Sequence, residues 1–350
     1  MDTFIEYLLS DYSVHLAILV GIYLILAQGF NLTFGVARLF NLAHIAAYAV
    51  GAYTTALMST DFTIWLPLHS VSSQEACTEL CTCVGSACFA LGFEPVQLGG
   101  YSFFPCIFAS IALSGLFAVS IGAISLRLTQ EYFAIGTIAF ASVISALLIN
   151  WKSLTRGVLG IPGIPRPRSD ILDYFLSRWV TDYNSENFFY TNSNFLVLLL
   201  IFVIIVQGYC WLLFRSSFAR SLRAQAESEV ASLALGKKTR IDRNVCFFIS
   251  SATAGLAGSF FAYYLNYIDP SSFAFPEMVF VLTIVVVGSP GAFWGVIAAT
   301  FFLVLLPEPL RFTHIDSSIL GPMRQLLHAL ILFGVVYWKR EAIFPVERKI

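Results

Sequence analysis

Long apolar runs with almost no charged residues recur along this sequence, and they constrain its fold more than any other feature. The runs are about 20 residues long, the length that a helix needs to cross the hydrocarbon core of a bilayer. Of the 350 residues, 58% are hydrophobic and 12% are charged, whereas soluble domains carry about 25% charged residues. The sequence therefore predicts an all-α integral membrane protein, a polytopic helical bundle forming a single transmembrane domain over residues 1–350.

Two apolar runs, 275–287 and 293–306, are shorter than the rest and are split by the sequence Gly288-Ser-Pro-Gly291. Each falls below the roughly 20 residues of a straight crossing, so the pair predicts either two assisted crossings or a re-entrant hairpin. In both cases the chain returns to the side from which it entered. With them, the pattern predicts about eight or nine spans or half-spans. The other predicted spans are 14–33, 39–58, 104–126, 132–150, 195–214, 245–265 and 325–338.

The segment 215–243 is a polar, basic stretch between two apolar runs. It contains seven Lys or Arg residues and three acidic residues. Cytoplasmic loops of membrane proteins carry an excess of Lys and Arg, so we expect 215–243 to be cytoplasmic. Counting spans then places the N-terminus and the loops 59–103 and 151–194 outside, and the C-terminus in the cytoplasm. The loop 151–194 is an exception to this rule, because it contains five Lys and Arg residues although it is placed outside.

The middle of segment 215–243 has helical periodicity. Apolar residues recur there at spacings of four and three residues, which places them on one face of a helix. They are Leu222, Ala226, Val230 and Leu233. Ser221 fits an N-cap and Gly236 a C-terminal stop. A helix of about 14 residues is roughly 21 Å long, which is too short to span a bilayer. It fits a docking element for a partner protein, a helix lying on anionic lipid, or a solvated connector.

The loop 59–103 contains four cysteines within 12 residues. In an oxidising compartment they are expected to form disulfides, with three possible pairings, and free thiols are the alternative. A metal site is disfavoured because the spacing C-x3-C-x-C-x4-C fits no common zinc pattern. The four residues are Cys77, Cys81, Cys83 and Cys88.

Ionisable side chains are almost absent from the predicted spans. Glu277 lies near the end of one predicted span and His44 lies within another, and a lone histidine is more often a hydrogen-bonded structural residue than a ligand. A proton-driven carrier needs a buried acid or histidine relay, so that class is disfavoured. The sequence shows no catalytic triad, no HExxH motif and no GxxxxGK[ST] loop, so we expect neither an enzyme nor a nucleotide, cofactor or metal site in this chain. The net charge of −1 does not indicate nucleic-acid binding.

Small residues recur every four positions in two of the predicted spans. One set is Ala43, Ala47, Gly51 and Thr55, and the other is Ser251, Gly255 and Ser259. Such faces permit close helix packing in lipid, which is the simpler interpretation. The alternative is that they line or flank a translocation path. Polar neighbours support this second interpretation: Gln28, Asn31, Asn41 and His44.

Several segments together resemble one family. The stretch 31–58, NLTFGVARLFNLAHIAAYAVGAYTTALM, resembles a signature of the permease subunits of branched-chain amino acid ABC importers. The stretch 131–167, with W-K-S-L-T-R-G followed by G-I-P-R-P, resembles a segment particular to the LivM-type subunit. The segments 216–264 and 285–311 are similar to the same subunit's cytoplasmic helix with its following span, and to its Gly-rich turn. The cysteine-bearing part of the loop, 66–100, has no counterpart in this pattern.

This resemblance implies an ABC-importer permease in a bacterial inner membrane. Its implied partners are a second permease chain, generally of a different type, two cytoplasmic ATPase subunits that bind ATP and Mg²⁺, and a periplasmic solute-binding protein. The helix 221–236 would then couple to the ATPase. Its apolar face would meet the ATPase, Arg223 and Glu227 would lie at the rim, and Gly236 would end the helix.

The implied function is inward transport of branched-chain amino acids, or similar small polar solutes, by alternating access. Two alternatives stay open. The first is a permease of the same superfamily for urea, amides, sugars or nucleosides. The second is a channel or facilitator that works without ATP, which would be marked by solute uptake in liposomes that contain this chain alone.

Overall fold

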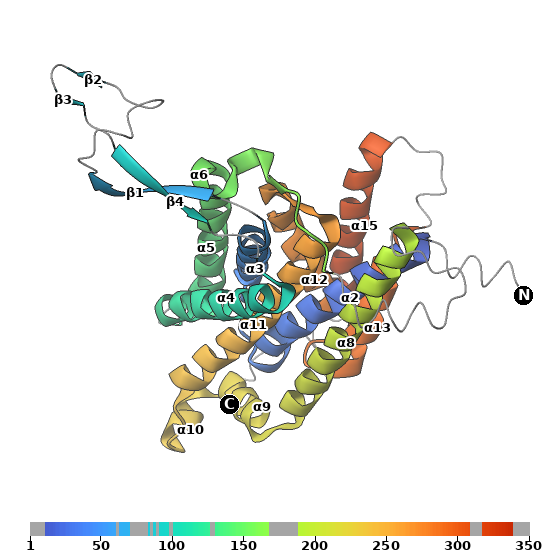
Figure 1. Cartoon of the computed structure of the whole chain (residues 1–350). Coiled ribbons are helices and arrows are strands. Elements are labelled where there is room, and N and C mark those ends of the chain that lie inside the picture. The colour runs from blue at the N-terminus through green and yellow to red at the C-terminus, as the bar shows by residue number, and fades with distance from the viewer. Residues whose placement is uncertain are drawn as a thin grey trace, which may run out of the picture.

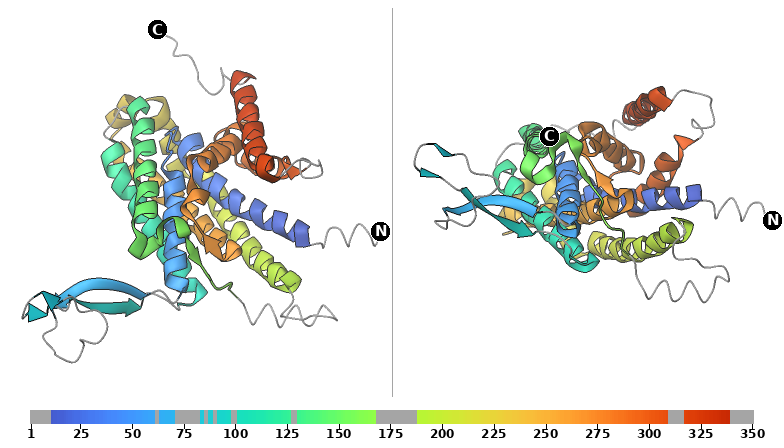
Figure 2. Two further views of the ribbon diagram at one scale, coloured as in Figure 1. Left: turned by 90° about the horizontal axis from the view of Figure 1, so that it is seen from above. Right: turned by 45° about the horizontal axis from the view of Figure 1, so that its top comes forward.

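The computed structural model describes residues 11–60, 63–70, 83–84, 87–88, 91–97, 101–126, 130–167, 188–308 and 317–338. These residues form a bundle of tilted helices (Figures 1 and 2). Within the described ranges, six helical segments are long and apolar enough to cross a membrane. This architecture confirms the predicted all-α membrane domain.

The first half of the bundle contains the helices that surround its centre. The helix α2 continues directly into a short π-helix, η1. Their bounds, with those of the next three helices, are α2 Asp11–Phe30, η1 Asn31–Val36, α3 His44–Ser59, α4 Phe103–Ser125 and α5 Gln130–Asn150.

The second half begins with a long helix that leads to two short helices at one end of the bundle, α9 and α10, and it returns through α11. The bounds are α8 Phe188–Arg215, α9 Ser217–Glu227, α10 Glu229–Ala234, α11 Thr239–Leu265, η3 Pro270–Phe273, α12 Phe275–Val287, α13 Phe293–Leu305 and α15 Ser317–Trp338.

Strands occur outside the long helices. In the loop 59–103, β1 Thr63–Ser70 pairs antiparallel with β4 Leu91–Gln97, and β2 Cys83–Val84 pairs with β3 Ala87–Cys88. A two-residue bridge, β5 Ile161–Pro162 with β6 Tyr267–Ile268, joins the loop after α5 to the end of α11. Between α5 and β5 lie the short helices α6 Lys152–Thr155 and η2 Gly157–Leu159. The hairpin β1–β4 and α6 lie at the end of the bundle opposite to α9 and α10 (Figures 1 and 2).

The helix α11 occupies the centre of the bundle and packs against α2, α3 and α4. Glycine makes this packing close. A Cβ atom added at Gly51 of α3 would lie 2.4 Å from the Cα atom of Gly255 in α11. Lipid tails are as apolar as the helices, so close packing and hydrogen bonds, rather than the hydrophobic effect, hold helices together in a membrane. The small residues therefore let α11 serve as the shared partner of its neighbours.

The two short apolar runs form separate helices, α12 and α13, on either side of a turn. Ser289 and Gly291 in this turn have positive φ angles of 69° and 82°. The second helix has 13 residues, so it is about 20 Å long, shorter than the roughly 30 Å hydrocarbon core. The turn packs against η1, where a Cβ atom at Gly35 would lie 2.1 Å from the Gly291 nitrogen.

Several predicted boundaries differ from the structure. The second predicted span, 39–58, begins at His44, because Arg38 has a left-handed φ of 52° and the Leu39 amide donates to the Thr33 carbonyl, 2.9 Å away. The fifth helix begins at Phe188 rather than 195, and the last begins at Ser317 rather than 325. Polar residues within the first two turns of each helix shorten the apolar run without ending the helix.

Candidate functional site

The helix α9 packs one face onto the bundle. Its N-cap is Ser216, whose hydroxyl accepts from the Ala219 amide at 3.3 Å. Ala219, Leu222 and Gln225 are buried, whereas Arg223 and Glu227 are exposed and Ala226 is half-buried. The periodicity in the sequence therefore marks a face that covers this chain's own core.

The prediction of one continuous helix over 221–236 is wrong. Ser228 adopts an extended conformation, with φ −152° and ψ 108°, and ends α9. Its hydroxyl accepts from the Ala231 amide at 3.3 Å and thereby caps a second helix, α10. Ser221, the predicted N-cap, lies inside α9. The prediction that Leu222 faces outward is also wrong, because it is 1% exposed and packs inward.

The helix α10 presents an apolar tip to the surroundings of the bundle. We define the apolar tip as Val230, Leu233 and Leu235, which are 79%, 54% and 82% exposed. Gly236 follows with a φ of +77°, and its amide donates to the Leu233 carbonyl at 2.9 Å, which ends the helix there. Leu235 does not fit the four- and three-residue spacing, so the sequence pattern missed it.

A polar brace fixes α9 and α10 to the start of α11. The Asp242 carboxylate accepts from Gln225 Nε2 at 2.6 Å and from the Ser221 hydroxyl at 3.1 Å. Arg243 forms an ion pair with Glu229 at 3.0 Å. These contacts tie both short helices to the helix at the centre of the bundle.

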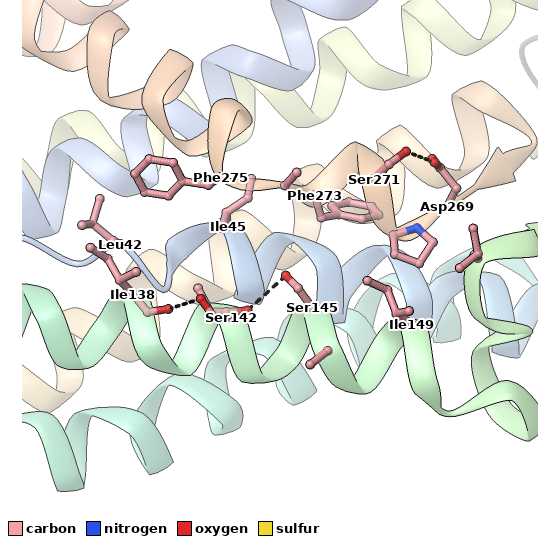
Figure 3. A pocket seen from close by; sticks show the side chains of 15 residues that line it. Leu42, Ile45, Ile138, Ser142, Ser145, Ile149, Asp269, Ser271, Phe273 and Phe275 are labelled. Carbon is pink, nitrogen blue, oxygen red and sulfur yellow. Dashed lines mark hydrogen bonds between the residues drawn. The ribbon is translucent and has the colours of Figure 1, made fainter.

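A cavity of about 540 Å³ lies between α3, α5, η3 and the first turn of α12 (Figure 3). Its walls are mainly apolar and include Leu42, Ile45, Ile138, Ile149, Phe273 and Phe275. Hydroxyl and carboxylate groups also reach it, from Ser142 and Ser145 of α5 and from Asp269 and Ser271 before and within η3. Small-molecule sites share this combination of apolar walls with a few polar groups.

Asp269 lies at one end of this cavity, beside Ile149 and Ser271 (Figure 3). Asp269 directly follows β6, which lies at the end of the bundle opposite to α10. Burial by itself raises the pKa of Asp269, but hydroxyl donors from Ser271 and Ser272 and backbone amides outweigh it, so the pKa lies below its ordinary value. The group is therefore a carboxylate at neutral pH.

The predicted path residues Gln28 and Asn31 connect α2 and η1 to the turn before α13. Both are fully buried. Gln28 Nε2 donates to the Phe293 carbonyl at 3.0 Å, and Asn31 Oδ1 accepts from the Gly291 amide at 2.8 Å. Neither side chain lines the cavity. In this conformation the two residues hold the turn against η1.

The other two predicted path residues, Asn41 and His44, are also buried. Asn41 Oδ1 accepts from the Ala43 amide at 3.2 Å, in the turn just before α3. His44 Nε2 lies 3.1 Å from the Leu26 carbonyl oxygen, and its Nδ1 lies 3.2 Å from the Ser250 hydroxyl. His44 thus connects α2, α3 and α11. A role for these four residues in translocation stays a prediction.

The predicted packing residues lie where α3 meets α11. Gly51 faces Gly255, and the Thr55 hydroxyl donates to the Ser259 hydroxyl at 2.8 Å. The remaining members of the two sets are buried: Ala43, Ala47 and Ser251. These contacts agree with the simpler interpretation of the small residues, close packing.

The predicted disulfides of the loop 59–103 stay a prediction, with their pairing open. Cys83 and Cys88 are opposite each other as backbone partners of β2 and β3. Cys77 and Cys81 lie outside the described residues.

The described residues thus combine membrane-length apolar helices with an exposed apolar tip, braced to α11, and a cavity of small-molecule size. Residues 12–336 match the family profile described as branched-chain amino acid transport system / permease component. This chain belongs to that family. The match covers both the bundle and the segment that carries the apolar tip.

Two curated relatives agree with the family. The chain is 29% identical over 355 aligned residues to the high-affinity branched-chain amino acid transport system permease protein LivM of Escherichia coli (strain K12), covering 98% of this chain and 72% of the relative. It is 30% identical, with the same coverage, to the protein of the same name from Salmonella typhimurium (strain LT2). No solved structure gives a significant match. The LivM-type resemblance expected from the sequence is thereby confirmed.

Proposed function

We propose that this chain is a transmembrane permease subunit of an ABC importer that moves branched-chain amino acids inward by alternating access. Family membership over residues 12–336 carries the proposal. The names of the two relatives supply the solute class. In this proposal the chain lies in a bacterial inner membrane with a second permease subunit. Two cytoplasmic ATPase subunits bind ATP and Mg²⁺, and a periplasmic binding protein delivers the solute.

The apolar tip supports docking to an ATPase subunit. Val230 and Leu233 of the short helix α10, and Leu235 directly after it, are all more than half exposed. A cluster of large apolar side chains at an otherwise charged surface marks an interaction site more often than a solvated one. Exposed basic side chains follow at Lys237 and Lys238. A protein groove with apolar walls and an acidic rim is the complementary partner.

The polar brace supports transmission of ATPase movement into the bundle. A ligand shifts a conformational equilibrium only through contacts that differ between the two states. Because Asp242 and Arg243 fix α9 and α10 to α11, a force on α10 acts directly on the helix that packs against α2, α3 and α4. ATP closure in the partner subunits would thereby tilt α11 and change access to the path.

The excess of Lys and Arg over 215–243 supports a cytoplasmic position for α9 and α10. The structure has α6 and the hairpin β1–β4 at the opposite end (Figure 1). That end would then face the periplasm and the binding protein. Asp269 and the bridge β5–β6 belong to the same outer end of the bundle.

The substitution Val230→Asp tests docking, because it places a charge in the middle of the apolar tip. We expect the full complex to lose solute uptake, since the charge would be buried against the ATPase without a partner. The matched control is Ala224→Asp, which places the same charge on the exposed face of α9 away from the tip. Uptake of labelled leucine and ATP hydrolysis are measured in proteoliposomes. Wild-type uptake by Val230→Asp would show that α10 does not dock to the ATPase.

A further inference from the structure

We propose that the cavity between α3, α5, η3 and α12 is a binding site for the transported amino acid, and that Asp269 binds its α-ammonium group. The inference rests on the proposed function, which supplies an aliphatic amino acid as the solute. The inference identifies the place in this chain where the solute binds. It also identifies which chemical group of the solute each wall of the cavity contacts.

The size and walls of the cavity fit an aliphatic side chain. Its volume of about 540 Å³ lies within the range of about 300–1,000 Å³ that small-molecule pockets occupy. Leu42 and Ile45 line it from the α3 side, Ile138 and Ile149 from α5, and Phe273 from η3. A leucine or valine side chain removes apolar surface from water when it enters, so these walls favour branched aliphatic solutes over polar ones.

The negative charge of Asp269 fits the α-ammonium group of the solute. Among the described residues that line the cavity, Asp269 is the one with an ionisable side chain. Its carboxylate is held by Ser271 and Ser272, which fixes its position at the end of the cavity. An ammonium group would add a charge-assisted hydrogen bond there, the stronger kind of hydrogen bond.

Two hydroxyls continue the polar side of the cavity along α5. Ser142 and Ser145 donate to the carbonyl oxygens of Ile138 and Ala141, at 3.0 Å and 3.1 Å. Their own oxygen atoms keep the capacity to accept from an ammonium group. From Asp269 the cavity passes Ile149, then Ser145, then Ser142 (Figure 3). The order gives the ammonium group successive acceptors as the solute moves along α5.

A lipid acyl chain is the main rival occupant of an apolar cavity in a membrane protein. The apolar walls alone would accept it. The carboxylate of Asp269 argues against an acyl chain at that end of the cavity, because an acyl chain offers the charged group neither a cation nor a hydrogen-bond donor. A zwitterionic amino acid carries a cationic group as well as an aliphatic chain, and so it satisfies both parts of the site.

The test uses the complete transporter in proteoliposomes, with ATP inside, the binding protein outside and labelled leucine as the probe. Asp269→Asn keeps the shape of the side chain and removes its charge. We expect its leucine uptake to fall about tenfold or more, the size of one lost charge-assisted hydrogen bond. Asp269→Glu should restore part of the uptake. ATP hydrolysis stimulated by the binding protein reports that the variant complex is assembled.

A second variant tests the apolar walls through specificity. Ala146 lines the cavity from α5, so Ala146→Leu narrows it. We expect it to lower uptake of leucine more than uptake of valine, because the larger solute loses more room. The matched control is Val143→Leu on the same helix, at a 54% exposed position that does not line the cavity. It should leave the ratio of the two uptake rates unchanged.

The outcomes separate this inference from the proposed function. If the wild-type complex imports leucine with ATP but Asp269→Asn imports it equally well, the solute site is refuted and the proposed function stands. If Ala146→Leu and Val143→Leu lower uptake of both amino acids alike, the cavity contacts lipid and the inference fails. If the wild-type complex shows no ATP-dependent leucine uptake, the proposed function fails and the inference fails with it.

Discussion

Replacing Gly51 with alanine forces α3 and α11 apart at a close contact between their backbones. The added Cβ atom would lie 2.4 Å from both the Cα atom and the carbonyl oxygen of Gly255. Ordinary van der Waals contact begins at 3.4 Å, so the shortfall is 3.4 − 2.4 = 1.0 Å. The obstructing atoms are backbone, which cannot rotate away as a flexible side chain does. The helices must therefore separate by roughly 1 Å.

The expected cost combines steric strain with weakened hydrogen bonds. Overpacking by one methyl group in a close contact costs about 1–3 kcal/mol. The Ser110 hydroxyl bridges the carbonyl oxygens of Gly51 and Gly255, at 3.1 Å and 2.8 Å, and the Thr55–Ser259 bond lies one turn away. Side-chain hydrogen bonds between helices in membranes contribute on average about 0.6 kcal/mol each. We therefore expect Gly51→Ala to destabilise the bundle by about 2–4 kcal/mol.

Thermal unfolding of the purified protein in detergent measures this effect. Gly51→Ala should lower Tm by several degrees and reduce uptake in the reconstituted complex, because α11 links the bundle to the apolar tip. The control is Gly208→Ala in α8, where an added Cβ atom meets nothing within 4 Å. This variant should keep or raise Tm, because alanine favours a helix over glycine. Equal Tm values for the two variants would refute the packing argument.

Three further predictions concern the brace, the outer end and the cavity. Asp242→Ala removes the acceptor that joins α9 to α11, so the solute imported per ATP hydrolysed should fall severalfold in proteoliposomes; unchanged coupling would contradict the brace. Arg166→Gln removes donors to Asn266 and Asn192, at 2.6 Å and 2.7 Å, and Tm should fall because these part-buried acceptors lose partners, at about 1–3 kcal/mol for a fully buried one. The pKa of Asp269 lies below its ordinary value, so the side chain should stay ionised from about pH 7 to about pH 5. Over this range the wild type should keep its advantage in leucine uptake over Asp269→Asn. The advantage should be lost only as the pH falls through the lowered pKa. A ratio of the two uptake rates that declines within this range would contradict the ionised anchor.

The apolar runs were sufficient to predict the membrane helices. A run of about 20 apolar residues has few alternatives to a spanning helix, because the bilayer leaves no other partner for its backbone. The errors occurred at helix ends such as His44, where tertiary hydrogen bonds rather than composition decide where a helix begins.

The structure of segment 215–243 was predicted less well, for a physical reason. Periodicity shows that Leu222 and Val230 share a face only if the helix is continuous. Ser228 is compatible with a helix interior and with a cap, and the brace at Asp242 and Glu229 decides for the cap. Periodicity also gives no information on whether a face packs against its own chain or a partner. In the structure Leu222 packs against its own chain, whereas Val230 is exposed.

The cavity was not predicted from the sequence. Its walls come from residues as distant as Ile45, Ser142 and Asp269, and no short motif connects them. Asp269 lies just before an apolar run and reads as a loop residue in the sequence. The bridge β5–β6 and the path of α11 position it beside α5, which is information that only the folded chain contains.

Leucine uptake into proteoliposomes, with and without ATP inside, tests the central claim most directly. The vesicles contain this chain with a second permease and two ATPase subunits, and the binding protein is added outside. The proposed function predicts ATP-dependent accumulation of leucine that is lost when this chain is omitted or carries Val230→Asp. Leucine uptake by this chain alone, without ATP or ATPase subunits, would contradict it and identify a facilitator.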